Sequence, residues 1–173
     1  MISSADIERI TTLIFDIDGT LTDGRIGWAG NGDTVKFFHM RDIHWLKLAL
    51  RAGLRVGVLS GRADAANRRL RGEVPFSFVA EGVKDKVAGF EDLLRTYGLT
   101  AAECLYAGDD VVDIPVLRRA GIGVAVADAA AEVAAEADWR TRAAGGRGAA
   151  AEIVRRVLRE KHLLDRIMER YRR

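Results

Sequence analysis

A short apolar run that ends in two carboxylates is the feature that most constrains the fold of this chain. Residues 11–16 read TTLIFD, and Ile17, Asp18 and Gly19 follow directly. Continuous apolar character over so few residues predicts a strand buried on both faces, as in a parallel sheet covered by helices. The acidic side chains then lie at the carboxyl end of the strand, where open parallel sheets bind their ligands.

Similar apolar runs recur along the chain and alternate with amphipathic segments of helical length. Strand and helix in alternation predict an α/β fold with a parallel sheet and helices on both faces. Gly53 and Gly98 stand where helix C-caps are expected. We expect further strands at residues 55–60, 77–80, 104–107 and 123–126, and helices at 42–52, 63–72, 84–97 and 112–120.

Two segments depart from this alternation. Residues 24–39 predict a β-hairpin insertion, because Asn31-Gly32 between two short strands is a strong turn signal. After a glycine-rich loop at residues 142–148, one long amphipathic C-terminal helix is expected from about residue 149. We therefore expect a single domain over residues 1–173, with the hairpin at about 24–39 and a helical tail at about 149–173.

The composition favours an ordinary soluble globular protein over a nucleic-acid-binding or membrane protein. Of the 173 residues, 49% are hydrophobic and 30% are charged, and the formal net charge is +2. Residues 147–173 hold nine Lys or Arg against four Asp or Glu, so this tail either meets an anionic substrate or is a solvated helix end. Cys104 is the only cysteine, and we recognise no signal peptide and no membrane-spanning stretch, so we expect a cytoplasmic protein without an intramolecular disulfide.

Polar side chains stand at or just past the carboxyl ends of four predicted strands. Because these ends share one edge of a parallel sheet, the side chains are expected to converge there. Each feature has an ordinary explanation by itself, such as a loop, a turn, a solvated lysine or a helix N-cap. Their occurrence in this order favours a functional site. The residues are Asp16, Asp18, Ser60, Gly61, Arg62, Lys86, Asp109, Asp110 and Asp113.

This set of groups suits magnesium-dependent phosphoryl transfer. Mg²⁺ prefers a few carboxylate ligands, and a cation keeps crowded carboxylates ionised. With the phosphate charge masked, a carboxylate can attack phosphorus and form an aspartyl phosphate. The Ser60 hydroxyl and the Lys86 ammonium would hold phosphate oxygens. A second carboxyl two residues after the nucleophile lies on the same face of an extended segment, where it can protonate the leaving oxygen and later activate water.

The same residues resemble the four sequence motifs of the haloacid dehalogenase superfamily of phosphatases. DIDGTLTD at residues 16–23 resembles the first motif, Ser60 the second, Lys86 the third and GDDVVD at residues 108–113 the fourth. The resemblance implies a Rossmann-like α/β fold in which Asp16 is the nucleophile. It further implies that Asp18 is the acid/base, that Lys86 is catalytic, and that Asp16, Asp109 and the backbone carbonyl of Asp18 bind Mg²⁺, with Asp110 and Asp113 behind them.

Members of the superfamily usually carry a cap domain between motifs, and this chain has no room for one. Only 43 residues separate Asp16 from Ser60, and 25 separate Ser60 from Lys86. The capless pattern resembles the 3-deoxy-D-manno-octulosonate 8-phosphate phosphatases of lipopolysaccharide precursor synthesis. It implies a keto sugar acid phosphate as substrate and a homotetramer whose neighbouring subunits close each site, without nucleic-acid or membrane partners. The hairpin with Trp28 and the basic tail are available for that closure.

Two arginines are candidate substrate-binding residues. Arg62 can pair bidentately with a substrate carboxylate, or it caps a turn or pairs with Asp64. Arg147 either binds substrate or orders the glycine-rich loop. The resemblance departs at residues 41–45, which read Arg-Asp-Ile-His-Trp where the family usually has Arg-Asp-Gly-x-Gly. We expect the pocket or the subunit contact to differ there, with His44 facing solvent or touching substrate.

Three alternatives remain open from the sequence. A phosphatase for another sugar acid phosphate, such as a nonulosonate 9-phosphate, would use the same chemistry. A catalytically silent binding module would need only the hairpin and the tail, but the acidic set is intact. A receiver-type signalling domain also forms an aspartyl phosphate, although it has no need of a second carboxyl such as Asp18 to activate water.

Overall fold

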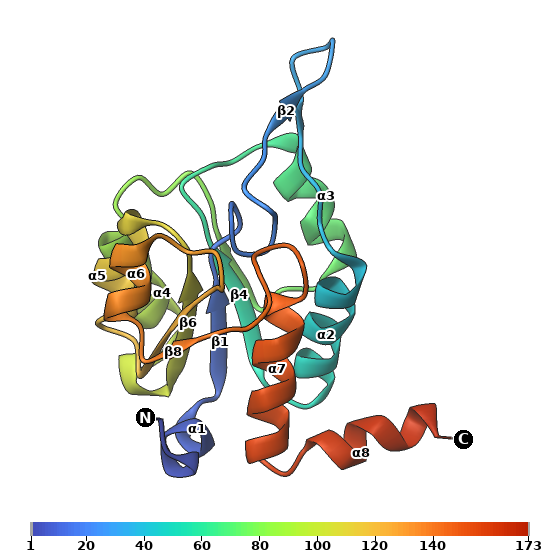
Figure 1. Cartoon of the computed structure of the whole chain (residues 1–173), viewed down its shortest axis with the longest axis vertical. Coiled ribbons are helices and arrows are strands. Elements are labelled where there is room, and N and C mark those ends of the chain that lie inside the picture. The colour runs from blue at the N-terminus through green and yellow to red at the C-terminus, as the bar shows by residue number, and fades with distance from the viewer. Residues whose placement is uncertain (1, 173) are drawn as a thin grey trace.

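The computed structural model describes residues 2–172, and its centre is a six-stranded sheet in the order β5-β4-β1-β6-β7-β8 (Figure 1). Every neighbouring pair in this sheet is parallel. The predicted α/β fold is therefore confirmed, although the last strand was not predicted because it is only two residues long. The strands are β1 Thr12–Phe15, β4 Arg55–Leu59, β5 Phe78–Ala80, β6 Cys104–Gly108, β7 Ile122–Ala125 and β8 Trp139–Arg140.

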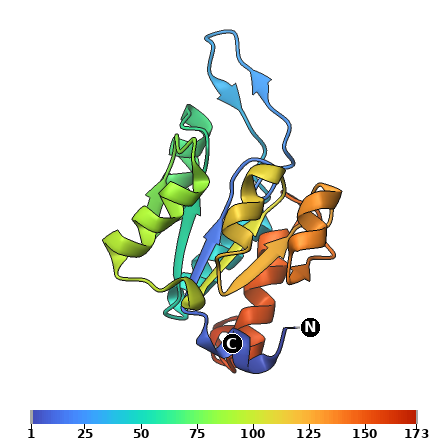
Figure 2. The same cartoon turned by 90° about the vertical axis from the view of Figure 1, so that its left-hand side faces the viewer.

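Helices cover both faces of the sheet, and two hydrophobic clusters fill the space between (Figures 1 and 2). Successive residues of β1 point to opposite faces, so Leu13 and Phe15 join one cluster and Ile14 joins the other. All four residues of β1 are buried, as its apolar run predicts. The helices are α1 Ser4–Arg9, α2 Met40–Arg51, α3 Ala65–Glu73, α4 Lys86–Tyr97, α5 Ile114–Leu117, α6 Ala131–Glu136, α7 Ala149–Glu160 and α8 Leu164–Met168.

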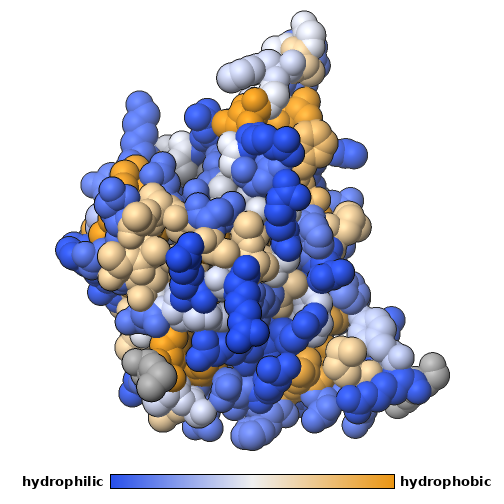
Figure 3. Space-filling model, viewed as in Figure 1, coloured by the Kyte–Doolittle hydropathy of each residue, from blue (hydrophilic) through white to orange (hydrophobic). Residues whose placement is uncertain are grey.

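The predicted hairpin projects beyond the carboxyl ends of the sheet strands (Figure 1). Its strands are β2 Gly27–Trp28 and β3 Thr34–Val35, and Gly32 in the connecting turn has a φ of 82°. Trp28 is 77% exposed and Phe37, just after β3, is 65% exposed. Apolar atoms gather near the hairpin on the surface of the molecule (Figure 3). The hairpin therefore presents apolar side chains that this chain does not itself cover.

The prediction of one long C-terminal helix was wrong. The chain leaves α7 after Glu160, and His162 has a left-handed φ of 55°. The buried face of α7 ends at Leu158, and after the turn Leu163, Leu164, Ile167 and Met168 pack against the same hydrophobic cluster. The short helix α8 and a 3₁₀ turn at Glu169–Tyr171 then run in a different direction (Figure 1).

Smaller differences concern short helices. The predicted helix at 112–120 is a 3₁₀ turn, Val111–Asp113, followed by the short α5. Helices α1 and α6 were not predicted, because six residues carry too little periodicity to be recognised. Within residues 2–172 no helix is long and apolar enough to cross a membrane.

Candidate active site

Three carboxylates meet at the carboxyl edge of the sheet. Asp16 directly follows β1, and Asp109 and Asp113 follow the adjacent strand β6. One oxygen from each of the three lies within 4.8 Å of the others. The turn after Asp16 can approach this closely only because residue 19 is glycine. Gly19 has a φ of 91°, and a Cβ there would lie 2.0 Å from an Asp109 oxygen.

Burial makes this group of carboxylates costly to ionise. Burial is the largest cause that raises the pKa of Asp16 to about 7, and the nearby charge of Asp113 adds to it. Burial likewise raises the pKa of Asp109 to about 7, helped by the charges of Asp16 and Asp113. Clustered oxygen ligands that resist ionisation fit a hard divalent cation such as Mg²⁺, because its charge offsets their repulsion.

Lys86 joins two of these carboxylates from the first residue of α4. Its Nζ lies 2.7 Å from Asp16 Oδ1 and 2.5 Å from Asp113 Oδ1. Burial opposes the charge on Lys86, but Asp16 and Asp113 outweigh burial and raise its pKa. The sequence predicted that Lys86 and Asp16 converge at one edge of the sheet, and the two side chains are in contact there.

Asp113 is fully occupied by neighbouring donors. Its Oδ1 accepts a hydrogen bond of 2.5 Å from the hydroxyl of Tyr106 in addition to the bond from Lys86. Its Oδ2 accepts the backbone N–H groups of Asp109 and Asp110 at 3.0 and 3.2 Å. Asp113 therefore holds Lys86 and the loop after β6 in place. Sequence analysis missed Tyr106, because it reads simply as an aromatic residue of a buried strand.

The side chain of Asp18 points to a different set of partners. Its Oδ1 lies 2.7 Å from Nζ of Lys36, and its Oδ2 lies 3.7 Å from Nε of Arg62. Its carboxylate does not belong to the group formed by Asp16, Asp109 and Asp113. The role expected for Asp18 toward a metal uses its backbone carbonyl and not this carboxylate.

Lys36 is the main site residue that sequence analysis missed. Its side chain is 0% exposed, and its Nζ also contacts Asp64 Oδ2 at 2.8 Å and Asn67 Oδ1 at 2.9 Å. The one available signal was a single lysine in the apolar stretch Val35-Lys36-Phe37-Phe38. Nothing in the sequence indicated that this lysine turns inward.

The remaining predicted residues of the second and fourth motifs lie around this edge. Ser60 follows β4, the neighbour of β1, and is buried; its Oγ accepts the backbone N–H of Arg62 at 3.2 Å. Gly61 and Arg62 are exposed. The exposed Asp110 accepts the N–H of Val111 at 2.7 Å and so caps the following 3₁₀ turn.

The glycine-rich loop packs directly against the turn that carries Asp18. A Cβ at Gly145 would lie 1.7 Å from the carbonyl oxygen of Gly19, and the N–H of Gly146 donates to the carbonyl of Thr20 at 3.0 Å. This packing places Arg147, 65% exposed, with its Nη2 3.9 Å from Oδ2 of Asp23. Arg147 therefore lies at the rim of the edge where the carboxylates meet.

The bulky residues at positions 43 and 45 pack into the hydrophobic core and are not part of the carboxylate group. Ile43 and Trp45 are 7% and 8% exposed and belong to a hydrophobic cluster. His44 lies on the exposed side of α2, where its Nε2 is 3.2 Å from the hydroxyl of Tyr171. Asp42 is buried and accepts the N–H groups of Gly148 and Ala151, which joins α2 to the start of α7.

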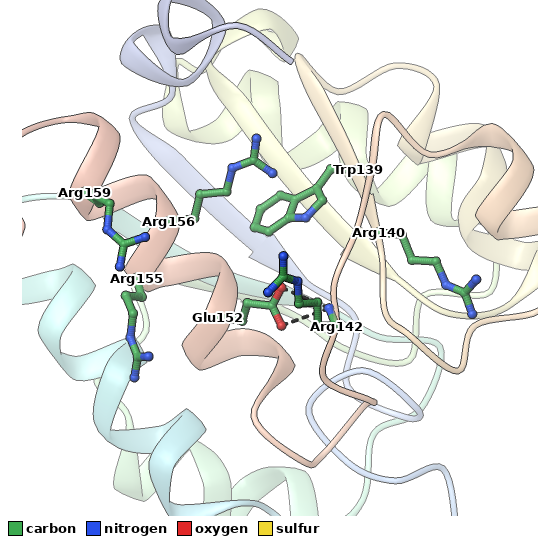
Figure 4. A pocket seen from close by; sticks show the side chains of 7 residues that line it. All are labelled: Trp139, Arg140, Arg142, Glu152, Arg155, Arg156 and Arg159. Carbon is green, nitrogen blue, oxygen red and sulfur yellow. Dashed lines mark hydrogen bonds between the residues drawn. The ribbon is translucent and has the colours of Figure 1, made fainter. Parts of the chain in front are cut away.

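Three arginines of the tail, Arg155, Arg156 and Arg159, line a separate hollow of about 570 Å³ between β8 and α7 (Figure 4). Arg156 stacks over Trp139 at 4.4 Å, while Arg140 points away from the others. The carboxylate of Glu152 accepts backbone N–H groups of Arg142 and Ala143. None of the residues of this hollow belongs to the carboxylate group. The lining residues are Trp139, Arg140, Arg142, Glu152, Arg155, Arg156 and Arg159.

Comparison with known proteins identifies the family of this chain. The model of the haloacid dehalogenase-like hydrolase family matches residues 75–153. The 3-deoxy-D-manno-octulosonate 8-phosphate phosphatase of Escherichia coli K12 is 36% identical over 166 residues, which cover 94% of this chain and 88% of that protein. The chain belongs to the haloacid dehalogenase-like hydrolases.

Further relatives of this haloacid dehalogenase-like hydrolase are similar in sequence or in structure. The Haemophilus influenzae phosphatase of the same name is 36% identical over 152 residues, covering 88% of this chain and 84% of that protein. The crystal structure of the Moraxella catarrhalis phosphatase, in complex with magnesium, phosphate and KDO, superposes with a TM-score of 0.93. It is 27% identical in sequence and covers 97% of both chains. A probable phosphatase from Pseudomonas syringae superposes with a TM-score of 0.94 at 34% identity, covering 98% of this chain and 97% of that one.

Proposed function

We propose that this chain is a magnesium-dependent phosphatase that hydrolyses 3-deoxy-D-manno-octulosonate 8-phosphate to the free sugar acid and phosphate. The observation that carries the proposal is the position of Lys86, whose ammonium joins Asp16 to Asp113 beside Asp109. A carboxylate at the end of the central strand thus has a cation on one side and clustered carboxylates on the other. Phosphoryl transfer requires such an arrangement of opposite charges around the transferred group.

We propose the following roles for the residues of the site. Asp16 and Asp109 would hold Mg²⁺, together with the carbonyl of Asp18, and the ion would mask the charge of the phosphate. An oxygen of Asp16 forms a bond to phosphorus as the bond from phosphorus to the sugar oxygen breaks. Asp18 gives its proton to that sugar oxygen and then takes a proton from water. The water oxygen attacks phosphorus, the bond to Asp16 breaks and phosphate leaves.

Substrate choice is assigned to the groups at the rim. Lys86 and the hydroxyl of Ser60, with the backbone at Gly61, would bind phosphate oxygens. Arg62 is exposed and lies beside Asp18, so its guanidinium is available to pair with the carboxylate of a keto sugar acid. Arg147 would assist from the glycine-rich loop.

The exposed hairpin supports a homotetramer in which neighbouring subunits close each site. Trp28 and Phe37 are large apolar side chains that this chain leaves exposed to solvent. Exposed apolar groups of this kind are typical of a contact surface, here with another copy of the chain. The cytoplasm and lipopolysaccharide precursor synthesis are the setting that we propose for this activity.

The test is an assay of the purified protein with Mg²⁺ on a panel of phosphate esters. Turnover of the octulosonate 8-phosphate with a kcat/KM at least tenfold above that of simple sugar phosphates is expected, and Arg62→Gln should remove most of this preference. A higher kcat/KM for a nonulosonate 9-phosphate would assign that substrate instead. Equal turnover of all esters would contradict the role of Arg62, and inert protein would contradict the proposed activity.

A further inference from the structure

The base of the hairpin holds a buried ammonium that the proposed reaction does not yet use. Lys36 follows β3 directly, and its side chain is 0% exposed. Burying an ammonium is costly unless each of its three N–H groups finds an acceptor. The Lys36 ammonium donates a hydrogen bond to Asn67 Oδ1 at 2.9 Å and forms ion pairs with Asp18 at 2.7 Å and Asp64 at 2.8 Å. It lies buried among these partners, so its effect on the reaction must pass through them.

Those partners lie in two separate segments, the turn after β1 and the start of α3. Asp18 lies in the turn after β1, and Asp64 is the N-cap of α3, where it accepts the N–H of Asn67 at 2.9 Å. The side-chain amide of Asn67 in turn donates to the carbonyl of Arg62 at 3.1 Å. One ammonium thus joins the hairpin, the turn of Asp18 and the loop that carries Arg62.

The two oxygens of Asp18 have unequal partners. Lys36 holds Oδ1 from a buried position, whereas Arg62, 60% exposed, stands 3.7 Å from Oδ2. Lys36 therefore supplies the close, fixed counter-charge, and Arg62 remains free to turn toward a substrate carboxylate. Without Lys36, Arg62 would be the one remaining cation paired with Asp18 among the residues described.

We propose that Lys36 is a positioning residue for the reaction, which fixes the acid/base carboxylate of Asp18 and leaves Arg62 available for substrate. This inference rests on the proposed function. It also makes the hairpin a structural part of the site, because displacing β3 would move Lys36 and with it the carboxylate. The sheet alone would then place the nucleophile but not the acid/base group.

The test is Lys36→Met assayed with Mg²⁺ on 4-nitrophenyl phosphate, an ester whose leaving group needs no proton. Formation of the aspartyl phosphate should stay fast, while its hydrolysis, which needs Asp18 to take a proton from water, should slow. We expect kcat to fall by about 10²-fold, with a burst of about one 4-nitrophenolate per active site. Circular dichroism and thermal unfolding report the fold of each variant.

Two further variants separate positioning from a merely structural role. Lys84→Met, which removes an exposed lysine outside this set of contacts, should retain a kcat near the wild-type value without a burst. Adding Lys36→Met to Asp18→Asn should not slow the enzyme further, because both changes remove the same function. If Lys36→Met folds poorly, Lys36→Arg, which keeps the charge but displaces it, should still show the burst.

Two results would overturn the inference alone. One is wild-type kcat without a burst in Lys36→Met, and the other is a multiplicative loss of rate when Lys36→Met is added to Asp18→Asn. A wild-type protein that is inert on every phosphate ester would overturn the proposed function and this inference together.

Discussion

Lys86 and Lys36 are both buried beside an aspartate of the same short segment, yet they are held in different ways. Lys86 begins α4 and lies between Asp16 and Asp113, which follow two adjacent strands of the central sheet. Lys36 belongs to the hairpin, an insertion outside that sheet, and reaches Asp18 and Asp64. The position of Asp16, the proposed nucleophile, is therefore set by strand register, whereas that of Asp18, the proposed acid/base, depends on how the hairpin packs.

This difference teaches that one edge of a sheet need not fix a whole active site. A one-residue slip of β1 would disrupt both faces of the core, so the position of Asp16 is strongly specified. The hairpin has no such constraint, since β2 and β3 pair over only two residues each and expose Trp28. Contacts from neighbouring subunits, as proposed above, would give the hairpin the order that its own strands do not supply.

The largest expected effect is on the nucleophile side. Lys86→Met leaves Asp16 and Asp113 buried without their shared cation, which typically costs about 3–5 kcal/mol of unfolding free energy. We expect a Tm lower by several degrees and a kcat reduced by about 10³-fold or more, because the phosphate also loses a cation. Chemical denaturation and steady-state kinetics measure both.

The matched control is Lys84→Met, two residues earlier on the exposed surface. It should change neither stability nor kcat appreciably, because a solvated lysine contributes little. A Lys86→Met variant as stable as Lys84→Met would contradict the burial argument for the Asp16–Lys86–Asp113 group.

A second prediction concerns pH. The pKa of Asp16 and of Asp109 is raised by burial to about 7, above the ordinary value of 3.8. The metal-free fold binds these protons more tightly than the unfolded chain does, so their contribution to stability is present below about pH 4 and is lost as the pH rises through about 7. Magnesium competes with the same protons, so below pH 7 its affinity should fall by about tenfold per pH unit for each proton displaced, and by up to about a hundredfold when both carboxylates are protonated.

Thermal unfolding with and without Mg²⁺ at pH 5 and pH 8 checks this. The increase in Tm caused by Mg²⁺ should be large at pH 8 and small at pH 5, and Asp109→Asn should abolish most of it. If Mg²⁺ raised the Tm equally at pH 5 and pH 8, protons and Mg²⁺ would not compete for these carboxylates, and the prediction would be wrong.

The smallest predicted effect is on the hairpin side and tests its dependence on neighbours. Trp28→Ser with Phe37→Ser removes exposed apolar side chains without touching Lys36 or the sheet. We expect a smaller assembly by light scattering and a higher KM for the sugar acid phosphate, with the stabilisation by Mg²⁺ unchanged. An unchanged assembly would remove the hairpin from the subunit contact.

Most of the fold and the nucleophile side follow from sequence, for a physical reason. Buried parallel strands leave continuous apolar runs, and polar residues directly after them mark the ligand-binding edge. Asp16, Lys86 and Asp109 could be located in this way. Gly19 and Gly145 are needed because the backbone at each lies too close to a neighbouring group for a Cβ atom. The sequence alone does not show these close contacts.

The parts that sequence could not provide depend on tertiary contacts. The inward turn of Lys36 depends on the packing of a hairpin against α3, and the hydroxyl of Tyr106 reaches Asp113 only because a loop folds back onto β6. The break after α7 lies between two segments that both pack against the core, and a helical pattern continuing to residue 173 obscured it. Local pattern predicts elements, but not which side chain meets another across them.

The most direct test of the central claim is to find the phosphoryl group on Asp16. The Asp18→Asn enzyme is mixed with Mg²⁺ and 4-nitrophenyl phosphate, quenched in acid, digested and analysed by peptide mass. The account predicts one added phosphoryl group on the peptide that contains Asp16, and none when Asp16→Asn is also present. A phosphoryl group on any other residue, or full turnover by Asp16→Asn alone, would contradict it.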